Sequence, residues 1–375
     1  MIIEFMDMKS TKFGGFERFM IRLMERMKGD EFHFVFQNYP ESSGMRKLYK
    51  ELGAHIHVVD TEGKKAITKI PAVYRLFKEI KPDIIHFHFA NGFFFYAPIA
   101  KLLGVKHLFK TQHCCLTKDD LTQVHHKGEL SLKTKIASWN GKVYKLFDKI
   151  VLCGKYVEDQ FCKVYGSSDK YEMIYFGTEP IHQISEEEQQ ELRKELGITD
   201  SDVIIATIAF ADPVKGVDVL IRALPYVKCE NYVVLLIGLN DSHGLTKLYH
   251  QMAITEEVDK HIRWIGITDE VYKYLSIADV YCQPSRSEAL TLAVCEAKSA
   301  HLPIVGSNVG GLPEISDIVF EAGNEIQLGE VLSSLINDGV LRQQLAEESY
   351  RDYVQNFNIE NGVEAYCRLY KDCAK

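Results

Sequence analysis

The alternation of short apolar runs with helical patterns constrains the fold of this chain more than any other feature of its sequence. Runs rich in isoleucine, valine and phenylalanine are followed by segments in which apolar residues recur every three or four positions. In the segment after Gly14-Gly15 this helical stripe consists of Phe16, Phe19, Met20, Leu23, Met24 and Met27. Strands that alternate with helices predict an α/β fold, in which helices cover both faces of a parallel sheet.

The pattern occurs on both sides of a polar and acidic run at 181–197. Because the chain has 375 residues, and single cores rarely grow past about 300 residues, we expect two domains with a linker near the start of that run. The expected strands are 1–6, 32–37, 55–59, 83–88, 107–111, 150–153, 172–175, 203–209, 232–237, 262–265, 280–283 and 303–305. The expected helices are 14–27, 45–52, 72–80, 217–224, 270–278 and 292–299, and the end of the chain from residue 329 is expected to be helical.

Charge is distributed unevenly along the chain. Residues 1–177 contain 28 Lys and Arg against 20 Asp and Glu, whereas the remaining residues contain 16 against 32. The positive balance of the first half indicates a basic surface for an anionic partner. The segment 127–149 has six lysines interleaved with apolar residues, which is typical of a helix that contacts an anionic membrane surface; a solvated lysine face over a core stripe is the alternative. We expect no nucleic-acid binding, because no recognised module occurs and the second half is acidic.

Hydropathy and cysteine content indicate where the protein works. No apolar stretch approaches the ~20 residues that span a membrane, and the N-terminus has no basic region followed by an apolar one, so we expect no secretion signal. The nine cysteines include no C-x-x-C pair and no zinc-ligand spacing. We therefore expect a reduced cytoplasmic protein with buried thiols. No cofactor and no metal ligands are assigned from the sequence.

The stretch 283–314 has the pattern of a site-bearing strand, loop and helix. Glu288 lies in a polar turn, Glu296 follows eight residues later inside a helical run, and the turn Gly310-Gly311 comes after the next apolar strand. The backbone N–H groups of a helix that begins near Thr291 favour an anion such as a phosphate. Carboxylates accept hydrogen bonds from paired sugar hydroxyls, so the two glutamates are candidate sugar-binding residues.

Two further candidates lie in the first half. The glycine pair Gly14-Gly15 separates a strand from a helix and allows the backbone to approach a ligand, although a plain turn is the alternative reading. His113 follows the expected strand 107–111, and ligands of open α/β sheets gather at the carboxyl ends of strands. A lone histidine is more often structural. His86 and His88 alternate on a strand, which favours a place in the core or on the sheet surface.

The stretch 283–314 resembles the E-x7-E signature of the retaining glycosyltransferases of family 4, including the preceding P-S and the trailing P-I-V-G-S-x-x-G-G-x-x-E. The recognisable motifs extend over residues 210–314. This resemblance implies the GT-B architecture, with two facing Rossmann-like domains and parallel sheets. It implies an acceptor-side domain at 1–180, a nucleotide-sugar donor domain at 181–357, and a last helix, about 358–375, that returns to the first domain.

The resemblance also implies roles for individual residues. Lys215 and Gly216 match the end of the family's G-R-x-x-x-x-K-G motif, but Phe210 stands where the arginine would be. Lys215 would neutralise the leaving diphosphate, with Arg286, another residue or backbone N–H groups replacing the missing cation; a solvated turn lysine is the alternative reading. The resemblance further implies that Glu288 contacts the donor sugar and that His113 lies near it, together with the backbone N–H groups of Leu290, Thr291, Leu292 and Ala293. It implies that Glu296 binds the ribose hydroxyls and that the base packs near Ile267. Gly14 and Gly15 would face the diphosphate and the acceptor.

The function that the resemblance implies is metal-independent hexosyl transfer with retention. The donor would be a nucleoside-diphosphate sugar, UDP-linked, and the acceptor a hydroxyl of a glycan or lipid-linked saccharide in surface polysaccharide or glycoconjugate synthesis at the inner face of the cell membrane. Ala289 and Thr291 stand where many members have glycines, so the sugar is not assigned by resemblance. Two alternatives remain open: an inactive homologue that serves as a partner or chaperone subunit, and a nucleotide-sugar 2-epimerase.

Overall fold

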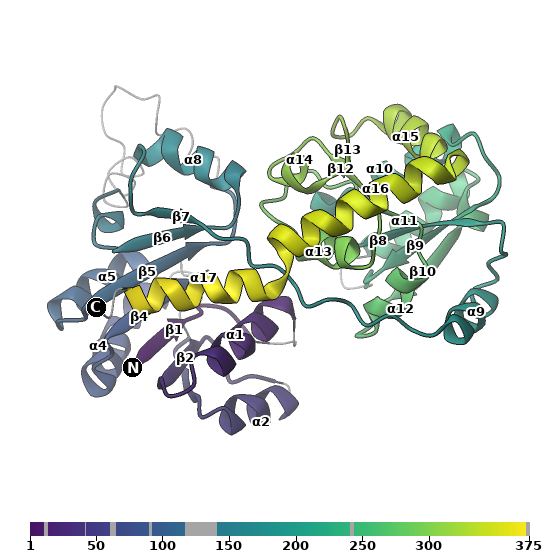
Figure 1. The fold of residues 1–375 in the computed structure, drawn as a ribbon. Coiled ribbons are helices and arrows are strands. Elements are labelled where there is room, and N and C mark those ends of the chain that lie inside the picture. The colour runs from purple at the N-terminus through teal and green to yellow at the C-terminus, as the bar shows by residue number, and fades with distance from the viewer. Residues whose placement is uncertain are drawn as a thin grey trace. The chain divides into compact units, whose positions relative to one another are not determined.

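A computed structural model describes residues 1–10, 14–41, 43–60, 65–89, 92–116, 141–240 and 244–372 (Figure 1). The chain forms two compact units. The first consists of Met1–Phe176 together with Ile359–Lys375, and the second of Gly177–Asn358. The chain therefore leaves the first unit after Phe176 and re-enters it at Ile359.

The first unit is built on a parallel sheet of seven strands in the order β3-β2-β1-β4-β5-β6-β7. Its strands are β1 (Ile2–Phe5), β2 (Phe32–Phe36), β3 (His55–Val58), β4 (Ile84–His88), β5 (His107–Gln112), β6 (Lys149–Leu152) and β7 (Tyr171–Met173). Among the described residues its helices are α1 (Gly15–Arg26), α2 (Ser43–Glu51), α3 (Lys65–Thr68), α4 (Ile70–Ile80), α5 (Phe93–Leu102), α8 (Lys155–Tyr165) and α17 (Ile359–Asp372).

The second unit repeats this topology with a parallel sheet of six strands in the order β10-β9-β8-β11-β12-β13. Its strands are β8 (Val203–Ile208), β9 (Tyr232–Ile237), β10 (Ile262–Gly266), β11 (Val280–Gln283), β12 (Ile304–Ser307) and β13 (Ile318–Phe320). Its α-helices are α9 (Glu186–Glu195), α10 (Val217–Ala223), α11 (Leu245–Thr255), α12 (Val271–Ser276), α13 (Leu292–Ser299), α14 (Leu312–Ile315), α15 (Glu325–Asn337) and α16 (Gly339–Asp352).

The burial of the central strands explains why their sequences are continuously apolar. Every residue of β1, β2, β4 and β9 is buried, as expected for a parallel sheet with both faces covered by helices. The α/β fold predicted from the alternation of apolar runs and helical patterns is confirmed. Several elements were not predicted, among them β13 and α9. Helix α9 lies in the polar and acidic run 181–197, near whose start the linker was expected. It begins with a capping box in which Ser185 and Glu188 bond to each other's backbone N–H.

Helix α17 is attached to the first sheet by a buried hydrogen-bond network. The hydroxyl of Tyr370 donates to Oε1 of Glu4 over 2.7 Å and lies 2.5 Å from Nδ1 of His86. On the other side of the ring, Nε2 of His86 lies 2.8 Å from Oγ1 of Thr111, which lies 2.6 Å from the hydroxyl of Tyr366. These side chains are all fully buried. The sheet therefore contains polar groups whose partners come from a helix more than 250 residues away in the sequence.

Within the described residues, no helix combines the length and the apolar character needed to cross a bilayer.

We predict that Tyr370→Phe destabilises the first unit, because it leaves a carboxylate oxygen of Glu4 and a ring nitrogen of His86 buried without this partner. Such a loss costs about 1–3 kcal/mol. Hydrogen exchange of the β1 and β4 amides reads the first unit separately from the second and should accelerate. The control is Tyr74→Phe, which removes a hydroxyl from a side chain that is 37% exposed. Equal exchange rates in the two variants would contradict the role assigned to the network.

Candidate functional site

The candidate residues of the second unit lie where the strand order of the sheet reverses, between β8 and β11. Strands β8 and β11 are neighbours although they are not consecutive in the chain. The loops that leave their carboxyl ends run in opposite directions, and ligands of doubly wound sheets bind at such points. Lys215 lies in the loop after β8, and Glu288 lies in the loop after β11.

Lys215 and Glu288 form an ion pair across these two loops. Nζ of Lys215 lies 2.7 Å from Oε1 of Glu288, and the side chains are only 15% and 10% exposed. Lys215 ends a 3₁₀ turn, Pro213–Lys215, which begins with the carboxylate of Asp212 accepting from the N–H of Val214 over 2.8 Å. The sequence predicted both charged residues as site candidates, and the structure brings them together.

The carboxylate of Glu288 accepts further hydrogen bonds from its own loop. The hydroxyl of Ser285 donates to Oε1 over 2.9 Å, and Nε2 of Gln283 lies 3.5 Å from the same atom. Gln283 also donates to Ser285 over 2.7 Å and accepts from the hydroxyl of Tyr281 over 2.7 Å. Tyr281, Gln283 and Ser285 are buried. These partners were not predicted from the sequence. The signal for them is the alternation of polar residues, Gln283 and Ser285, where the apolar strand β11 ends.

Three glycines allow the loops around Glu288 to touch through their backbones. A Cβ atom at Gly216, where φ is +66°, would lie 1.9 Å from the carbonyl oxygen of Pro284. A Cβ at Gly310, where φ is +56°, would lie 1.7 Å from the carbonyl oxygen of Glu288, and one at Gly311 would lie 1.9 Å from that of Ala289. The K-G and G-G pairs of the sequence are therefore required by close approach of the backbone.

Phe210 contacts the ion pair from the position where the resemblance implies an arginine. Nζ of Lys215 lies 5.0 Å from the centroid of the Phe210 ring, a cation–π contact worth about 0.5–1 kcal/mol at an exposed site. The Phe210 side chain is 54% exposed. An aromatic face thus contacts Lys215 in this loop.

Arg286, one of the groups considered as a replacement cation, is paired with Asp218. Its Nη1 and Nη2 atoms each lie 2.7 Å from a different carboxylate oxygen of Asp218, and Nη1 also donates to the carbonyl of Pro213. Burial alone would raise the pKa of Asp218, but the hydrogen bond and charge of Arg286 hold it below its ordinary value. Asp218 also pairs with Arg222 of α10, so one ionised carboxylate is shared by two guanidinium groups.

Helix α13 begins beside the Glu288 loop. Its N-cap is Thr291, and the first backbone N–H groups of any helix have no acceptor within the helix. The four residues predicted to supply N–H groups, Leu290, Thr291, Leu292 and Ala293, form this helix entrance. Glu296 is the fifth residue of α13 and is half-buried. Ile267, predicted to lie near a base, follows β10 with 71% of its side chain exposed.

In the first unit, His113 follows β5 in a cluster of aromatic rings. Its ring stacks on Phe89 with centroids 4.0 Å apart, and Phe16 and Phe176 approach within 5.4 and 5.0 Å. Burial, then the charges of His88 and Lys110, holds the pKa of His113 well below its usual value, so the ring is neutral at pH 7. Phe89 has a φ of +54°, a left-handed conformation that is strained for a bulky residue.

The neighbours of His113 restrict its hydrogen bonding. Its Nε2 lies 3.0 Å from Nδ1 of His88, whose Nε2 lies 2.9 Å from Oε2 of Glu4. When His88 is neutral and donates to Glu4, its Nδ1 accepts from Nε2–H of His113. That arrangement leaves Nδ1 of His113 as the acceptor of its ring.

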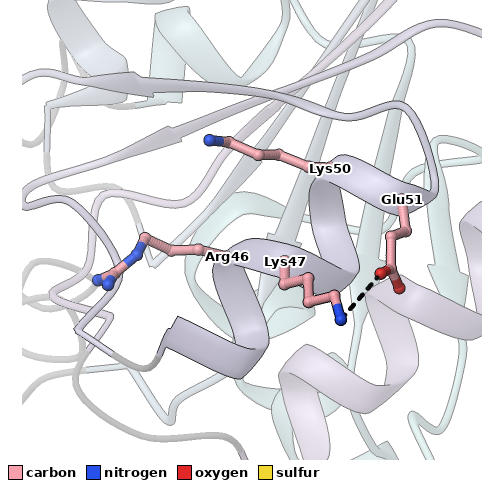
Figure 2. Close-up of a pocket in the computed structure, with 4 residues that line it drawn as sticks. All are labelled: Arg46, Lys47, Lys50 and Glu51. Atoms are coloured by element: carbon pink, nitrogen blue, oxygen red, sulfur yellow. Dashed lines mark ion pairs between the residues drawn. The ribbon is translucent and has the colours of Figure 1, made fainter.

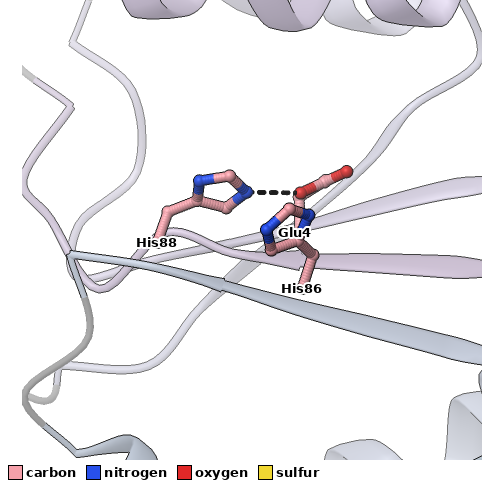
Figure 3. A group of neighbouring side chains, drawn as sticks. All are labelled: Glu4, His86 and His88. Carbon is pink, nitrogen blue, oxygen red and sulfur yellow. Dashed lines mark hydrogen bonds and ion pairs between the residues drawn. The ribbon is translucent and has the colours of Figure 1, made fainter. Parts of the chain in front are cut away.

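Glu4, His86 and His88 have ligand atoms within 4.8 Å of one another, the spacing of a metal site (Figure 3). The hydrogen bonds of the group indicate a different role. Both ring nitrogens of His86 have protein partners, and each oxygen of Glu4 has one. All three side chains are completely buried. We interpret the group as the hydrogen-bond network that holds α17, and the expectation that His86 and His88 belong to the core or sheet is confirmed.

The glycine pair begins α1. Gly14 is the N-cap, and its N–H donates to Oε2 of the buried Glu17 over 2.9 Å; Gly15 is the first residue of the helix. The pair therefore lies at a helix N-terminus that follows β1. The candidate membrane-contact segment 127–149 lies mostly outside the described residues, because the description resumes at residue 141.

A separate hollow lies on α2, lined by Arg46, Lys47, Lys50 and Glu51 (Figure 2). Lys47 pairs with Glu51 over 3.6 Å, one helical turn away. Arg46 donates to the carbonyls of Pro40 and Glu41. These contacts indicate a solvated basic helix face, and no residue predicted for the site lies there.

Two known protein families match this chain, one over most of each unit. The family described as "Glycosyltransferase Family 4" matches residues 13–180, and that described as "Glycosyl transferases group 1" matches residues 188–352. An uncharacterized glycosyltransferase of Methanocaldococcus jannaschii is 25% identical over 96% of this chain and 95% of its own length. The O-antigen biosynthesis glycosyltransferase WclY of Escherichia coli is 27% identical over 61% of this chain and 63% of its own length.

The length of these matches varies between relatives. The aligned regions span 60%, 95% and 49% of the first three curated relatives. Among solved structures, Anabaena HepE in complex with UDP superposes with a TM-score of 0.82 over 99% of this chain and 100% of its own, at 16% identity. A second structure of HepE contains UDP-glucose and gives a TM-score of 0.80. The fold is therefore of the GT-B type.

We predict that Gly310→Ala destabilises the second unit more than Gly323→Ala does. Both glycines have positive φ, +56° and +78°, so both substitutions meet the same backbone strain of about 1–2 kcal/mol. Only at Gly310 does the new Cβ collide with a backbone, that of Glu288, whereas Gly323 has open space. The added cost is about 1–3 kcal/mol.

Urea unfolding followed by Trp264 fluorescence in a Trp139→Phe background measures this difference. Equal midpoints for the two glycine variants would show that the Glu288 loop does not need the close approach at Gly310.

Proposed function

This chain belongs to the group 1 and family 4 glycosyltransferases, and we propose that it transfers a hexose with retention from a UDP-linked donor to a hydroxyl of a glycan or lipid-linked saccharide. The observation that supports this proposal most directly is the Lys215–Glu288 ion pair. It lies where the loops that follow β8 and β11 run apart, in the part of the chain that matches the group 1 family. We propose that this second unit, about 181–357, binds the donor.

The proposed roles of the pair follow from its charges. Breaking the bond between the sugar and the diphosphate places negative charge on the leaving group, and the ammonium of Lys215 stabilises that charge. The carboxylate of Glu288 accepts hydrogen bonds from hydroxyls of the donor sugar. The nearly complete burial of both side chains strengthens these interactions, because charges interact more strongly where water is excluded.

The remaining donor contacts are proposed for the entrance and the second turn of α13. The backbone N–H groups of residues 290–293 would interact with the sugar and diphosphate region, since helix N-termini favour anions. Glu296 would accept from the ribose hydroxyls, and the exposed side chain of Ile267 would pack against the base. The choice of UDP is supported by the HepE structures, which contain UDP and UDP-glucose.

Replacement of the family's arginine by Phe210 changes how charge is neutralised. Lys215 contacts an aromatic face, and Arg286 is bound to Asp218. We therefore propose that Lys215 and backbone N–H groups stabilise the diphosphate without a second side-chain cation. By resemblance, Gly14 and Gly15 are assigned to the diphosphate and the acceptor, and His113 to the donor sugar. The neutral state of His113 suits a hydrogen bond to a sugar hydroxyl.

The proposed acceptor and cellular location of the reaction rest on a relative of this chain and on its sequence. The relative named for O-antigen biosynthesis supports a role in surface polysaccharide synthesis. We propose that the reaction takes place in the cytoplasm at the inner face of the membrane, and that it needs no metal ion, since no D-x-D motif accompanies the predicted site.

We predict that one member of a panel of nucleotide sugars raises the melting temperature and is slowly hydrolysed, because binding to the native state stabilises it. Differential scanning fluorimetry and a nucleotide-release assay, both in EDTA, measure these effects. A response to no donor favours an inactive homologue that acts as a partner subunit. A sugar epimerised without acceptor favours a 2-epimerase, and turnover that stops in EDTA contradicts metal independence.

We predict that Glu288→Ala abolishes transfer while leaving nucleotide binding largely intact, because the carboxylate is assigned to the sugar and not to the nucleotide. Calorimetry with UDP measures binding, and product analysis with the donor from the panel measures transfer. Glu330→Ala, at an exposed position of α15, is the matched control and should retain both. Wild-type transfer by Glu288→Ala would refute the assigned role.

A further inference from the structure

Four side chains with metal-binding atoms lie on one face at the edge of the first sheet. His33 of β2 is the direct neighbour of His55 in β3, and Val35 is the neighbour of His57. Side chains two residues apart on a strand point to the same face, so His55 and His57 share a face with His33. Glu31 precedes β2 and lies two residues before His33. The strand order places β3 at the edge of the sheet.

The ligand atoms of Glu31, His33 and His55 lie close to one another. Oε1 of Glu31 lies 3.1 Å from Nε2 of His33 and 3.4 Å from Nε2 of His55. The ligand atoms of these three residues all lie within 4.8 Å of one another. Small side-chain rotations would place them around an ion at the usual bond length of about 2.1 Å.

His57 holds the ring of His33 from the other side. Its Nε2 lies 2.9 Å from Nδ1 of His33. Histidines that bind metals usually donate their second ring N–H to a neighbour, which fixes the tautomer and the ring orientation. Without an ion, Nε2–H of His33 donates to Oε1 of Glu31 over 3.1 Å. An ion would take the place of that proton, and the tautomer in which Nδ1–H of His33 donates to His57 then turns the lone pair of Nε2 toward the ion.

Exposure also suits an ion that arrives from solvent. The side chain of His33 is 8% exposed, whereas those of Glu31 and His55 are 49% and 55% exposed. The cluster differs in this from Glu4, His86 and His88, which are fully buried and hydrogen-bonded to one another and to other protein groups.

We propose that Glu31, His33 and His55 form a binding site for a divalent transition-metal ion of the zinc class, with His57 orienting His33. Two imidazoles and one carboxylate favour Zn²⁺, Co²⁺, Ni²⁺ or Cu²⁺ over Mg²⁺ and Ca²⁺, which take oxygen ligands. Water completes the coordination on the exposed side. The site is independent of the proposed transfer reaction, and its test does not depend on activity.

The ion would connect the edge strand to the rest of the sheet. His33 belongs to β2, Glu31 directly precedes that strand, and His55 belongs to β3. A bound ion would therefore link the two strands through their side chains. An ion that binds only the native arrangement stabilises it. The expected consequences are a higher melting temperature and slower hydrogen exchange of the β3 amides in the presence of zinc.

Isothermal titration of the full chain, prepared without a polyhistidine tag, with ZnCl₂ tests the proposal. We expect one saturable site in the wild-type protein and its loss in His55→Ala, a variant whose exposed position favours normal folding. His57→Ala should weaken binding by about 10–100-fold, the usual effect of removing a residue that orients a ligand.

Two controls identify the ligands. His182→Ala removes an exposed histidine of the second unit and should leave binding unchanged. Replacement of Cys114 and Cys115 by serine removes the thiols that are more exposed than those in the core, and binding should persist. Zinc binding that is equal in the wild type and His55→Ala, or that disappears with the two cysteines, would overturn the proposal.

Discussion

The buried ion pair between Lys215 and Glu288 is the constraint on which the second unit's site depends. Removing two charges from water costs several kcal/mol, which their attraction offsets only with good geometry and additional hydrogen bonds. Both are present: the pair is 2.7 Å long, and Ser285 donates to the same carboxylate. The geometry in turn requires Gly216 and Gly310, because any larger residue would push apart the loops that hold the pair.

The two units use the same strand order for different chemistry. In the second unit, the loops after β8 and β11 present opposite charges near a helix N-terminus. In the first unit, His113 follows β5 among aromatic rings, and its ring is kept neutral by burial. The glycine pair follows β1 at the start of α1. One topology therefore holds a buried ion pair in one unit and a neutral histidine among aromatic rings in the other.

The sequence predicted those features that depend on local pattern. Alternating apolar runs predicted the parallel sheets, and the family motif predicted Lys215 and Glu288 as site residues. That these two residues bond to each other depends on the pairing of β8 with β11, which no local pattern states. The contact of Phe210 with Lys215 was unpredicted for the same reason. Likewise the sequence alone does not indicate that His33 and His55 are neighbours, because this depends on the register of β2 and β3.

The return of α17 to the first unit has a consequence for synthesis on the ribosome. Residues 1–176 form a sheet in which Glu4 and His86 are buried, yet Tyr370, which bonds to both, emerges after the whole second unit. The second unit is continuous in sequence and can fold as soon as residue 358 has emerged. Until α17 is made, Glu4 and His86 lack their bonds to Tyr370, although each keeps another partner, His88 and Thr111 respectively. The unit that is made first is therefore the last to be completed. A nascent chain interrupted before Ile359 would contain a finished second unit and an incomplete first one.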